Sequence, residues 1–159
     1  MSVIRVFIHG LESSSQGTKA TYFRKRFSDM IIEDYPGSLE NRMDKLRNIL
    51  ADKENLILVG SSYGGLMAAM YTCDNEQAIK KLILLAPALN LEEFEPYLDR
   101  TIEIPVTLYH GSHDDLVPLK EVREIASRIF KNLSHHVVDD DHPLSTTFAS
   151  FDWDTLLDD

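Results

Sequence analysis

Short apolar runs alternate with longer amphipathic stretches along the whole chain. Six runs have the length and the aliphatic composition of β-strands. They are Val3–Ile8, Met30–Glu33, Leu56–Val59, Leu82–Leu85, Val106–Tyr109 and Ser134–Val138. Most of them are apolar at nearly every position, which is typical of parallel strands that are buried on both faces. The pattern therefore favours a parallel sheet inside the protein.

The stretches between the runs show the spacing of helices. Leu39, Met43, Leu46 and Leu50 recur every three or four residues, which places them on one face of a helix. We expect helices over Lys19–Ser28, Leu39–Leu50, Tyr63–Tyr71, Leu119–Lys131 and near Leu144–Phe151, with one short helix over Leu91–Leu98. Regular alternation of strand and helix predicts an α/β fold, a three-layer α/β/α sandwich of about six parallel strands with helices on both faces. The chain has 159 residues and neither a repeat nor a linker, so we expect one domain over residues 1–159.

Composition narrows the classes of partner. The formal net charge is −10, which argues against nucleic acid, because a phosphate backbone requires a basic face. No apolar run approaches the roughly 20 residues of a membrane span, so no membrane partner is expected. The single cysteine, Cys73, has no partner for an internal disulfide and is expected to pack in the core. A reducing, cytoplasmic location is the simplest expectation.

The most informative motif is Gly60-Ser61-Ser62-Tyr63-Gly64, which lies between a predicted strand and a predicted helix. It has the form G-x-S-x-G, in which the serine hydroxyl is exposed on a sharp turn and the glycines avoid a clash that any Cβ would cause. The alternative reading is an ordinary strand-to-helix turn with a serine that caps the helix. The rest of the chain has to distinguish the two.

A serine nucleophile needs a base, and the base needs an orienting acid. The predicted strand that ends at Tyr109 is followed by the segment His110-Gly111-Ser112-His113-Asp114-Asp115-Leu116-Val117-Pro118. The last predicted strand is followed by Asp139-Asp140-Asp141-His142-Pro143. Carboxylates and histidines thus follow two later strands, at the edge of a parallel sheet where the elbow serine also lies.

With these segments in place, nearly the whole chain resembles the α/β-hydrolase superfamily, and especially its compact, lidless bacterial serine esterases. Gly111–Pro118 resembles the family's G-x-x-D-x-x-V-P loop, which implies Asp114 as the acid of the triad, with the neighbouring Asp115 as the alternative. The histidine after the final strand implies His142 as the base, and His135 or His136 are the alternatives inside the strand. Three aspartates before His142 depart from the family's pattern. Their charge either favours a protonated histidine or is turned to solvent.

The first strand supplies the remaining part of the resemblance. His9-Gly10-Leu11-Glu12-Ser13-Ser14 is similar to the H-G-x-x-S-S segment of small esterases, which implies backbone N–H groups of Leu11 and Tyr63 as the oxyanion hole. His9, Gly10, Gly60 and Gly64 would form the supporting loops, with His9 holding loop geometry by hydrogen bonds. Ser13 and Ser14 are expected to brace the loop or cap the next helix. Because this strand is the first one predicted, we expect the sheet to lack the first two strands of the full superfamily fold, which leaves about six.

The resemblance implies a serine hydrolase of carboxylic esters, or of thioesters, that forms an acyl-enzyme at Ser62. No cofactor is expected, and the partner would be a small-molecule ester. A non-catalytic or regulatory protein on the same scaffold is the alternative, because a fold does not fix a function. A metal site among the histidines and aspartates is disfavoured because they lack ligand spacing on one element. The short segment after Leu85 leaves no room for a large cap domain. Leu89, Phe94, Tyr97 and Leu116 are candidates either for an acyl pocket or for the core.

Overall fold

A six-stranded parallel sheet forms the middle layer of the protein in the computed structural model, which describes residues 2–159. The strands lie in the order β2-β1-β3-β4-β5-β6, and every neighbouring pair is parallel. They span β1 Ile4–Ile8, β2 Ile31–Ile32, β3 Leu56–Ser61, β4 Ile79–Leu85, β5 Val106–Gly111 and β6 Leu133–Val138. All six predicted strands are therefore present, and their bounds differ from the predicted ones by at most three residues.

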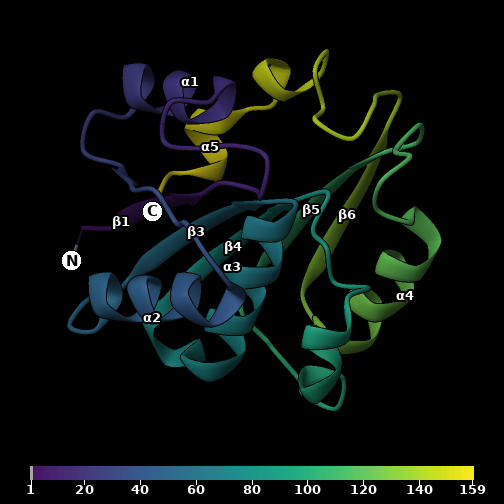
Figure 1. Cartoon of the computed structure of the whole chain (residues 1–159), viewed down its shortest axis with the longest axis horizontal. Helices are drawn as coiled ribbons and strands as arrows, with labels where there is room; N and C mark the ends of the chain where they lie inside the picture. The colour runs from purple at the N-terminus through teal and green to yellow at the C-terminus, as the bar shows by residue number, and fades with distance from the viewer. Residues whose placement is uncertain (1) are drawn as a thin grey trace.

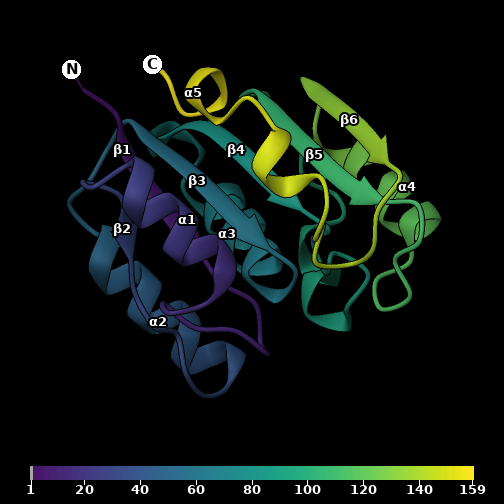
Figure 2. The same cartoon turned by 90° about the horizontal axis from the view of Figure 1, so that it is seen from above.

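Helices cover both faces of this sheet, as the alternating pattern predicts. The α-helices are α1 Thr18–Arg26, α2 Leu39–Leu50, α3 Tyr63–Asp74, α4 Leu119–Ile129 and α5 Trp153–Leu156. Three short 3₁₀ turns are η1 Glu76–Ala78, η2 Glu92–Tyr97 and η3 Phe148–Ser150. In Figure 1 the helices α1 and α5 lie above the sheet, and α2, α3 and α4 lie below it. Figure 2, seen from above, shows α1 in front of the strands and α5 at the edge of the sheet, beside the C-terminus. The predicted three-layer α/β/α sandwich is confirmed.

Each face of the sheet has its own core. On the α2, α3 and α4 side, aliphatic side chains from β1, β3, β4 and β5 pack against the helices, with Leu46, Leu58 and Leu66 completely buried. On the other side, an aromatic cluster joins α1 to the C-terminal segment, where Phe23 lies 4.8 Å from Trp153 between ring centroids. Cys73 is buried in the first core, as expected of a packing residue.

The predicted helix near Leu144–Phe151 is wrong. This segment is mostly turn, with only η3 in it, and the true helix α5 begins later, at Trp153. Leu144 has φ +55°, which a helix excludes, and the carboxylate of Asp140 accepts the backbone N–H groups of Thr146 and Thr147. The apolar residues nevertheless reach the core, since Leu144 and Phe148 are buried. Their spacing thus indicates burial here without a helix.

The ends of three other helices also differ from prediction, since α3 continues past Tyr71 to Asp74 and two helices stop early. Helix α1 stops at Arg26 because Phe27 leaves the helical conformation. Helix α4 stops at Ile129 because Phe130 turns to extended backbone and pairs with Ile102.

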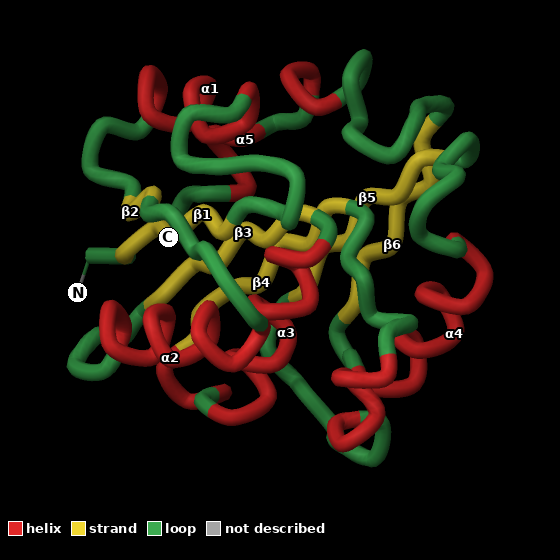
Figure 3. The backbone as a smooth tube through the Cα atoms, in the orientation of Figure 1, coloured by secondary structure: helices red, strands yellow, loops and turns green. Residues whose placement is uncertain are grey.

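Figure 3 shows that loops join the helices to the strand ends on either side of the sheet. No helix within residues 2–159 has the length and apolarity that a membrane crossing requires.

The strand order creates a crevice at one place. The chain passes from β1 to the edge strand β2 and then returns to the opposite side of β1 to form β3. At such a reversal of strand order the following loops diverge, and ligands of open α/β sheets bind outside the carboxyl ends of those strands. Ile8 at the end of β1 pairs with Gly60 of β3. The loop with Gly10 and the elbow with Ser62 therefore lie side by side.

Candidate active site

The elbow after β3 holds Ser62 in a conformation that few residues adopt. Ser62 has φ +57° and ψ −115°. Such a non-glycine conformation costs on the order of 1–3 kcal/mol and persists only where neighbouring structure enforces it. Here the Ser62 N–H donates to Leu85 O at 2.9 Å, and Ser62 O accepts the N–H groups of Gly65 and Ala88. The structure excludes the alternative of a helix-capping serine, because the Ser62 side chain makes no capping hydrogen bond to α3.

Close approach of the backbone explains both glycines of the motif. A Cβ on Gly64 would lie 2.0 Å from Ile8 O, and a Cβ on Gly60 would lie 2.4 Å from Gly64 O. Neither contact is possible for real atoms, so only glycine lets α3 begin against β1 and β3. The two glycines are thus required by space at this turn.

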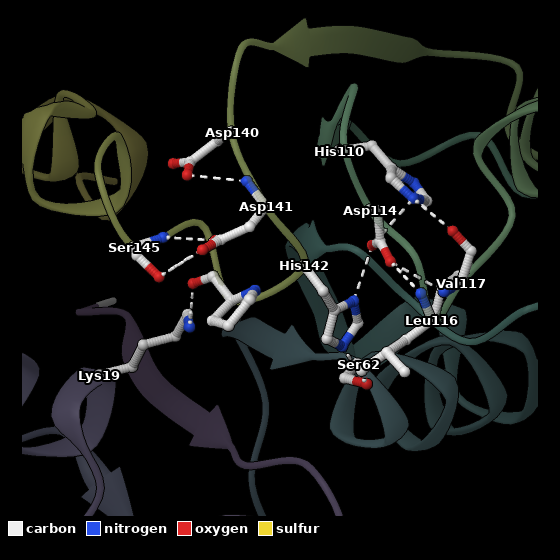
Figure 4. A network of polar contacts seen from close by, with 11 residues as sticks. Lys19, Ser62, His110, Asp114, Leu116, Val117, Asp140, Asp141, His142 and Ser145 are labelled. Atoms are coloured by element: carbon white, nitrogen blue, oxygen red, sulfur yellow. Dashed lines mark hydrogen bonds and ion pairs between the residues drawn. The ribbon is translucent and has the colours of Figure 1, made fainter.

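The structure brings Ser62, Asp114 and His142 together at the carboxyl ends of β3, β5 and β6. His142 Nε2 lies 3.0 Å from Ser62 Oγ, and His142 Nδ1 lies 2.7 Å from Asp114 Oδ2. Figure 4 shows the His142 ring between the two partners. The Asp114 side chain is completely buried and that of His142 is 13% exposed. In this arrangement Nδ1–H donates to the carboxylate and the unprotonated Nε2 accepts the serine hydroxyl.

The alternatives for the acid and the base lie elsewhere. Asp115 is exposed, and His135 and His136 are residues of β6. The His136 ring stacks on Tyr109 with centroids 4.8 Å apart. None of these three side chains contacts Ser62 or His142 within the described part of the chain.

The buried carboxylate of Asp114 is fully coordinated by donors. Its Oδ1 accepts the N–H groups of Leu116 at 2.9 Å and Val117 at 2.8 Å. Burial by itself raises the pKa of Asp114, but the hydrogen bonds from Val117, His142 and Leu116 outweigh it, and the pKa is lowered. Asp114 is therefore charged at neutral pH.

The loop after β1 lies directly over Ser62. A Cβ on Gly10 would lie 3.3 Å from Ser62 Cβ, which shows how near the two backbones are. Within residues 2–159 the N–H groups of Leu11 and Tyr63 have no hydrogen-bond acceptor. Tyr63 is the first residue of α3, where an N–H has no partner inside the helix. Two unpaired donors thus flank the serine, at the positions predicted for an oxyanion hole.

His9 fixes the shape of this loop, as the sequence predicts. Its Nε2 accepts the N–H of Tyr35 at 2.9 Å, so the proton is on Nδ1, which donates to Gly10 O at 2.7 Å. Ser14 braces the loop, because its Oγ accepts the N–H of Gln16. Neither Ser13 nor Ser14 caps the next helix, which begins after Gly17 without a side-chain cap.

The three aspartates before His142 are turned away from its ring. Asp139 pairs with His113 at 2.7 Å, and Asp141 accepts the N–H and the hydroxyl of Ser145. Burial alone would raise the pKa of Asp140, but hydrogen bonds from the Thr147 side chain and from nearby backbone N–H groups lower it to about 2. These carboxylates organise the loop that carries His142. Within residues 2–159, no three or more His, Cys, Asp or Glu side chains gather as metal ligands.

Sequence reasoning missed Lys19, which approaches this loop from α1. Its Nζ donates to Pro143 O at 2.6 Å and lies 5.4 Å from the centroid of the Phe148 ring. Burial lowers the pKa of Lys19, and the nearby charges of Asp141 and Asp140 oppose that change. The only sequence signal was its place near the start of a predicted helix, because 124 residues separate Lys19 from Pro143.

A cavity of about 530 Å³ opens at Ser62. Its apolar lining includes Leu11, Leu91, Leu116 and Val117, and its polar lining includes Glu12, Ser13, Thr18, Lys19 and Asn90. Leu11 and Leu116 are 52% and 71% exposed, which is unusual for large apolar side chains. Of the four predicted pocket candidates, only Leu116 lines the cavity. Leu89 and Phe94 belong to the core, and Tyr97 stacks on Phe94.

Comparisons with known proteins agree with this architecture. The sequence profile of the α/β hydrolase fold matches residues 10–102, which is more than half of the chain. A protein described as a predicted CIB-like hydrolase from Thermoplasma acidophilum is 23% identical, with a TM-score of 0.75 over 98% of this chain and 84% of that one. Est1E from Butyrivibrio proteoclasticus is 17% identical, with a TM-score of 0.77 over 94% and 83% of the chains.

An esterase from Pyrococcus furiosus is similar to the same degree. It is 17% identical, with a TM-score of 0.73 over 97% of this chain and 79% of that one. No protein with a curated description matches the sequence. At these identities the likeness to solved structures concerns the fold, whereas the family profile rests on the sequence itself.

Proposed function

Because the chain belongs to the α/β-hydrolase fold family, we propose that this hydrolase is a serine esterase. Ser62 would be its nucleophile, His142 its general base and Asp114 its orienting acid. The substrates would be carboxylic esters, and thioesters would follow the same chemistry. The observation that carries the proposal is the hydrogen-bonded chain from Ser62 Oγ through His142 to Asp114 Oδ2.

The first half of the reaction follows from these contacts. His142 Nε2 takes the hydroxyl proton as Ser62 Oγ attacks the ester carbonyl carbon. Asp114 holds the imidazole with its proton on Nδ1 and stabilises the ring once it is charged. The carbonyl oxygen becomes an oxyanion, which the N–H groups of Leu11 and Tyr63 would bind. One such donor is worth about 3–4 kcal/mol of transition-state stabilisation.

The second half regenerates the enzyme. The charged His142 gives its proton to the leaving alcohol, and the acyl group stays on Ser62 Oγ. A water molecule then loses a proton to His142 and attacks the acyl carbon. The acid leaves, and the proton returns to Ser62. The steps require only groups of this chain and one water molecule from solvent.

The cavity supports an ester with an apolar part. Leu11 and Leu116 line it with large exposed side chains, and Leu91 and Val117 add to its apolar lining. Each buried CH₂ group contributes about 0.8 kcal/mol, so lengthening an acyl chain should improve kcat/KM until the cavity is filled. Structural neighbours of this fold are described as an esterase and as a monoacylglycerol lipase, which makes ester cleavage a natural reaction class to test.

The test combines turnover with covalent labelling. The native protein should hydrolyse p-nitrophenyl esters in a series from acetate to dodecanoate and react with a fluorophosphonate probe. Ser62→Ala should abolish both while leaving the melting temperature Tm within a few degrees of the native value. Ser134→Ala, at an exposed serine of β6, is the matched control and should keep both. Labelling that persists in the Ser62→Ala variant would refute the assignment of Ser62 as the nucleophile. A native protein without turnover or labelling would favour a non-catalytic scaffold.

A further inference from the structure

A second histidine reaches the carboxylate of Asp114 from the side opposite His142. His110 lies on β5, and its side chain is completely buried. Its Nε2 donates to Val117 O at 3.1 Å and lies 3.2 Å from Asp114 Oδ2. Figure 4 shows Asp114 between the two histidine rings. The reaction proposed above gives His110 no role.

The surroundings of His110 fix its protonation. A carbonyl oxygen and a carboxylate oxygen both accept, so the nitrogen between them must carry the proton. The other ring nitrogen, Nδ1, is buried with no hydrogen-bond partner among the described residues. A proton there would be a buried, unpaired donor, which is costly. His110 is therefore neutral, with its single proton on Nε2, and burial lowers its pKa in agreement with this geometry.

That one N–H acts on the acid in two ways. Through Val117 O it anchors the loop whose own Leu116 and Val117 N–H groups hold Asp114 Oδ1. The same N–H of His110 also lies near Asp114 Oδ2, the oxygen that accepts the hydrogen bond from His142 Nδ1–H. A carboxylate oxygen with two donors is less basic toward each of them. The position and the strength of Asp114 thus both depend on His110.

We propose that His110 is a positioning residue for the acid of this site. It fixes the orientation of the Asp114 carboxylate and limits how strongly that carboxylate stabilises a charged His142. The proposal rests on the assignment of Ser62, His142 and Asp114 given above.

Removing the donor has a predictable direction. Asp114 Oδ2 then serves His142 alone, so the charged imidazole is favoured and the acid limb of the pH profile of kcat/KM moves to higher pH. A net hydrogen-bond contribution near the low end of the usual range corresponds to about half a pH unit. The freer carboxylate also orients His142 less well, and we expect kcat to fall about ten-fold.

Other charged groups around the site are unchanged by this substitution. They come from β6, α4, α1 and the loop that carries His142. They are His135, Arg123, Lys19, Asp140 and Asp141. None of them is within hydrogen-bond distance of Asp114 among the described contacts, so a shift of the acid limb would report on His110 itself.

The experiment compares three variants with the native protein. His110→Gln keeps an amide N–H near the place of Nε2, whereas His110→Met and His110→Asn leave no donor there. In His110→Met and His110→Asn, the acid limb of kcat/KM should move to higher pH and kcat should fall. In His110→Gln, both quantities should return toward the native values. His135→Met removes a histidine from the neighbouring strand and should leave the pH profile unchanged. Two donor-free variants are used so that the test remains possible if one of them does not fold. Thermal unfolding shows which variants are folded.

A second measurement does not depend on turnover. The ring signals of His142, assigned with His142→Gln, are titrated by proton NMR in the native protein and in each variant. The titration midpoint should rise by about half a pH unit in His110→Met and His110→Asn and return in His110→Gln. Equal midpoints and equal kcat in folded native, Met and Asn proteins would overturn the proposal, as would a Gln variant that behaves like Met. If the native protein lacks esterase activity, the proposed function fails while the NMR midpoints still decide the role of His110.

Discussion

Replacing Asp114 by asparagine changes one atom in the middle of the proposed triad. The new amide oxygen has to remain at the Oδ1 position, because Leu116 and Val117 both donate backbone N–H groups there. The amide nitrogen then takes the place of Oδ2 and donates toward His142 Nδ1. His142 must accept at Nδ1 and therefore carries its proton on Nε2, where it faces Ser62. A protonated Nε2 cannot take the serine proton.

The Asp114→Asn substitution should reduce activity far more than it reduces the stability of the fold. The wrong tautomer of the base in a Ser-His-Asp triad lowers kcat by about 10⁴-fold, equivalent to about 5 kcal/mol in the barrier. The fold loses much less. The amide nitrogen also faces His110 Nε2, donor against donor, but His110 keeps Val117 O as its acceptor. The cost to stability should therefore stay near the lower end of the usual range, about 1 kcal/mol, and lower Tm by about 2–4 °C.

The assay measures kcat for a p-nitrophenyl ester at pH 7–8 alongside Tm by thermal unfolding. Asp115→Asn is the matched control, since Asp115 is exposed and makes no hydrogen bond or ion pair to any residue in the range 2–159. It should keep kcat within about two-fold of the native value, in line with the small effects of exposed substitutions. A folded Asp114→Asn protein with more than a tenth of the native kcat would refute the reasoning. Loss of activity in Asp115→Asn instead would make Asp115 the acid.

Three further predictions concern the frame of the site. Lys19→Met removes the donor that holds Pro143 O and should lower kcat about ten-fold with little change in KM; a native kcat in the folded variant would exclude a role for that bond. Gly64→Ala places a Cβ 2.0 Å from Ile8 O and should destabilise the fold by about 3 kcal/mol or more, read from urea unfolding, whereas an unchanged midpoint would contradict the packing. Burial lowers the pKa of His135 to about 4, so between pH 6.5 and 4 the unfolded chain binds a proton that the native state does not, and stability should fall on acidification. After discount for partial exposure the loss is about 1 kcal/mol, and His135→Gln should flatten that slope.

The parts of the fold that were predictable are those with a local cause. The interior strands are apolar over most of their length, because both faces of the sheet are covered, and this pattern can be recognised without knowing which strands pair. Helix α2 was predicted with its correct bounds, since Ser38 caps it by accepting the Asn41 N–H and its apolar stripe runs from Leu39 to Leu50. The C-terminal segment shows the limit. Leu144 and Phe148 have helical spacing, but the positive φ of Leu144 and the bonds to Asp140 give turns instead.

The parts of the site that were missed depend on contacts between distant segments. The elbow and the two loops could be recognised because each follows its own strand and carries its own motif. Lys19 meets Pro143 only because α1 and the C-terminal loop lie on the same side of the sheet. His110 begins the segment that follows the predicted strand, but no motif gives it a role, and its contact with Asp114 depends on how the loop turns back after Gly111. Tertiary folding alone creates these contacts.

The three members of the proposed triad are not held equally by the sheet. Ser62 follows β3, beside β1 and its Gly10 loop, so the register of two paired strands fixes the nucleophile and both N–H donors together. His142 follows the edge strand β6, three strand spacings away, or roughly 14 Å. Its loop must therefore reach back across the sheet, and strand pairing gives it no support there.

The loop that carries His142 is also where polar contacts are concentrated. Asp140 accepts backbone N–H groups from three residues, Asp141 binds Ser145, and Lys19 binds Pro143 O. Without these contacts a loop on an edge strand would sample many positions, and the 3.0 Å separation between His142 Nε2 and Ser62 Oγ would be kept only part of the time. The position of His142 is therefore determined by side chains around its loop, whereas the position of Ser62 is determined by the pairing of strands in the sheet. Substitutions around residues 139–147 should accordingly reduce turnover before they reduce stability.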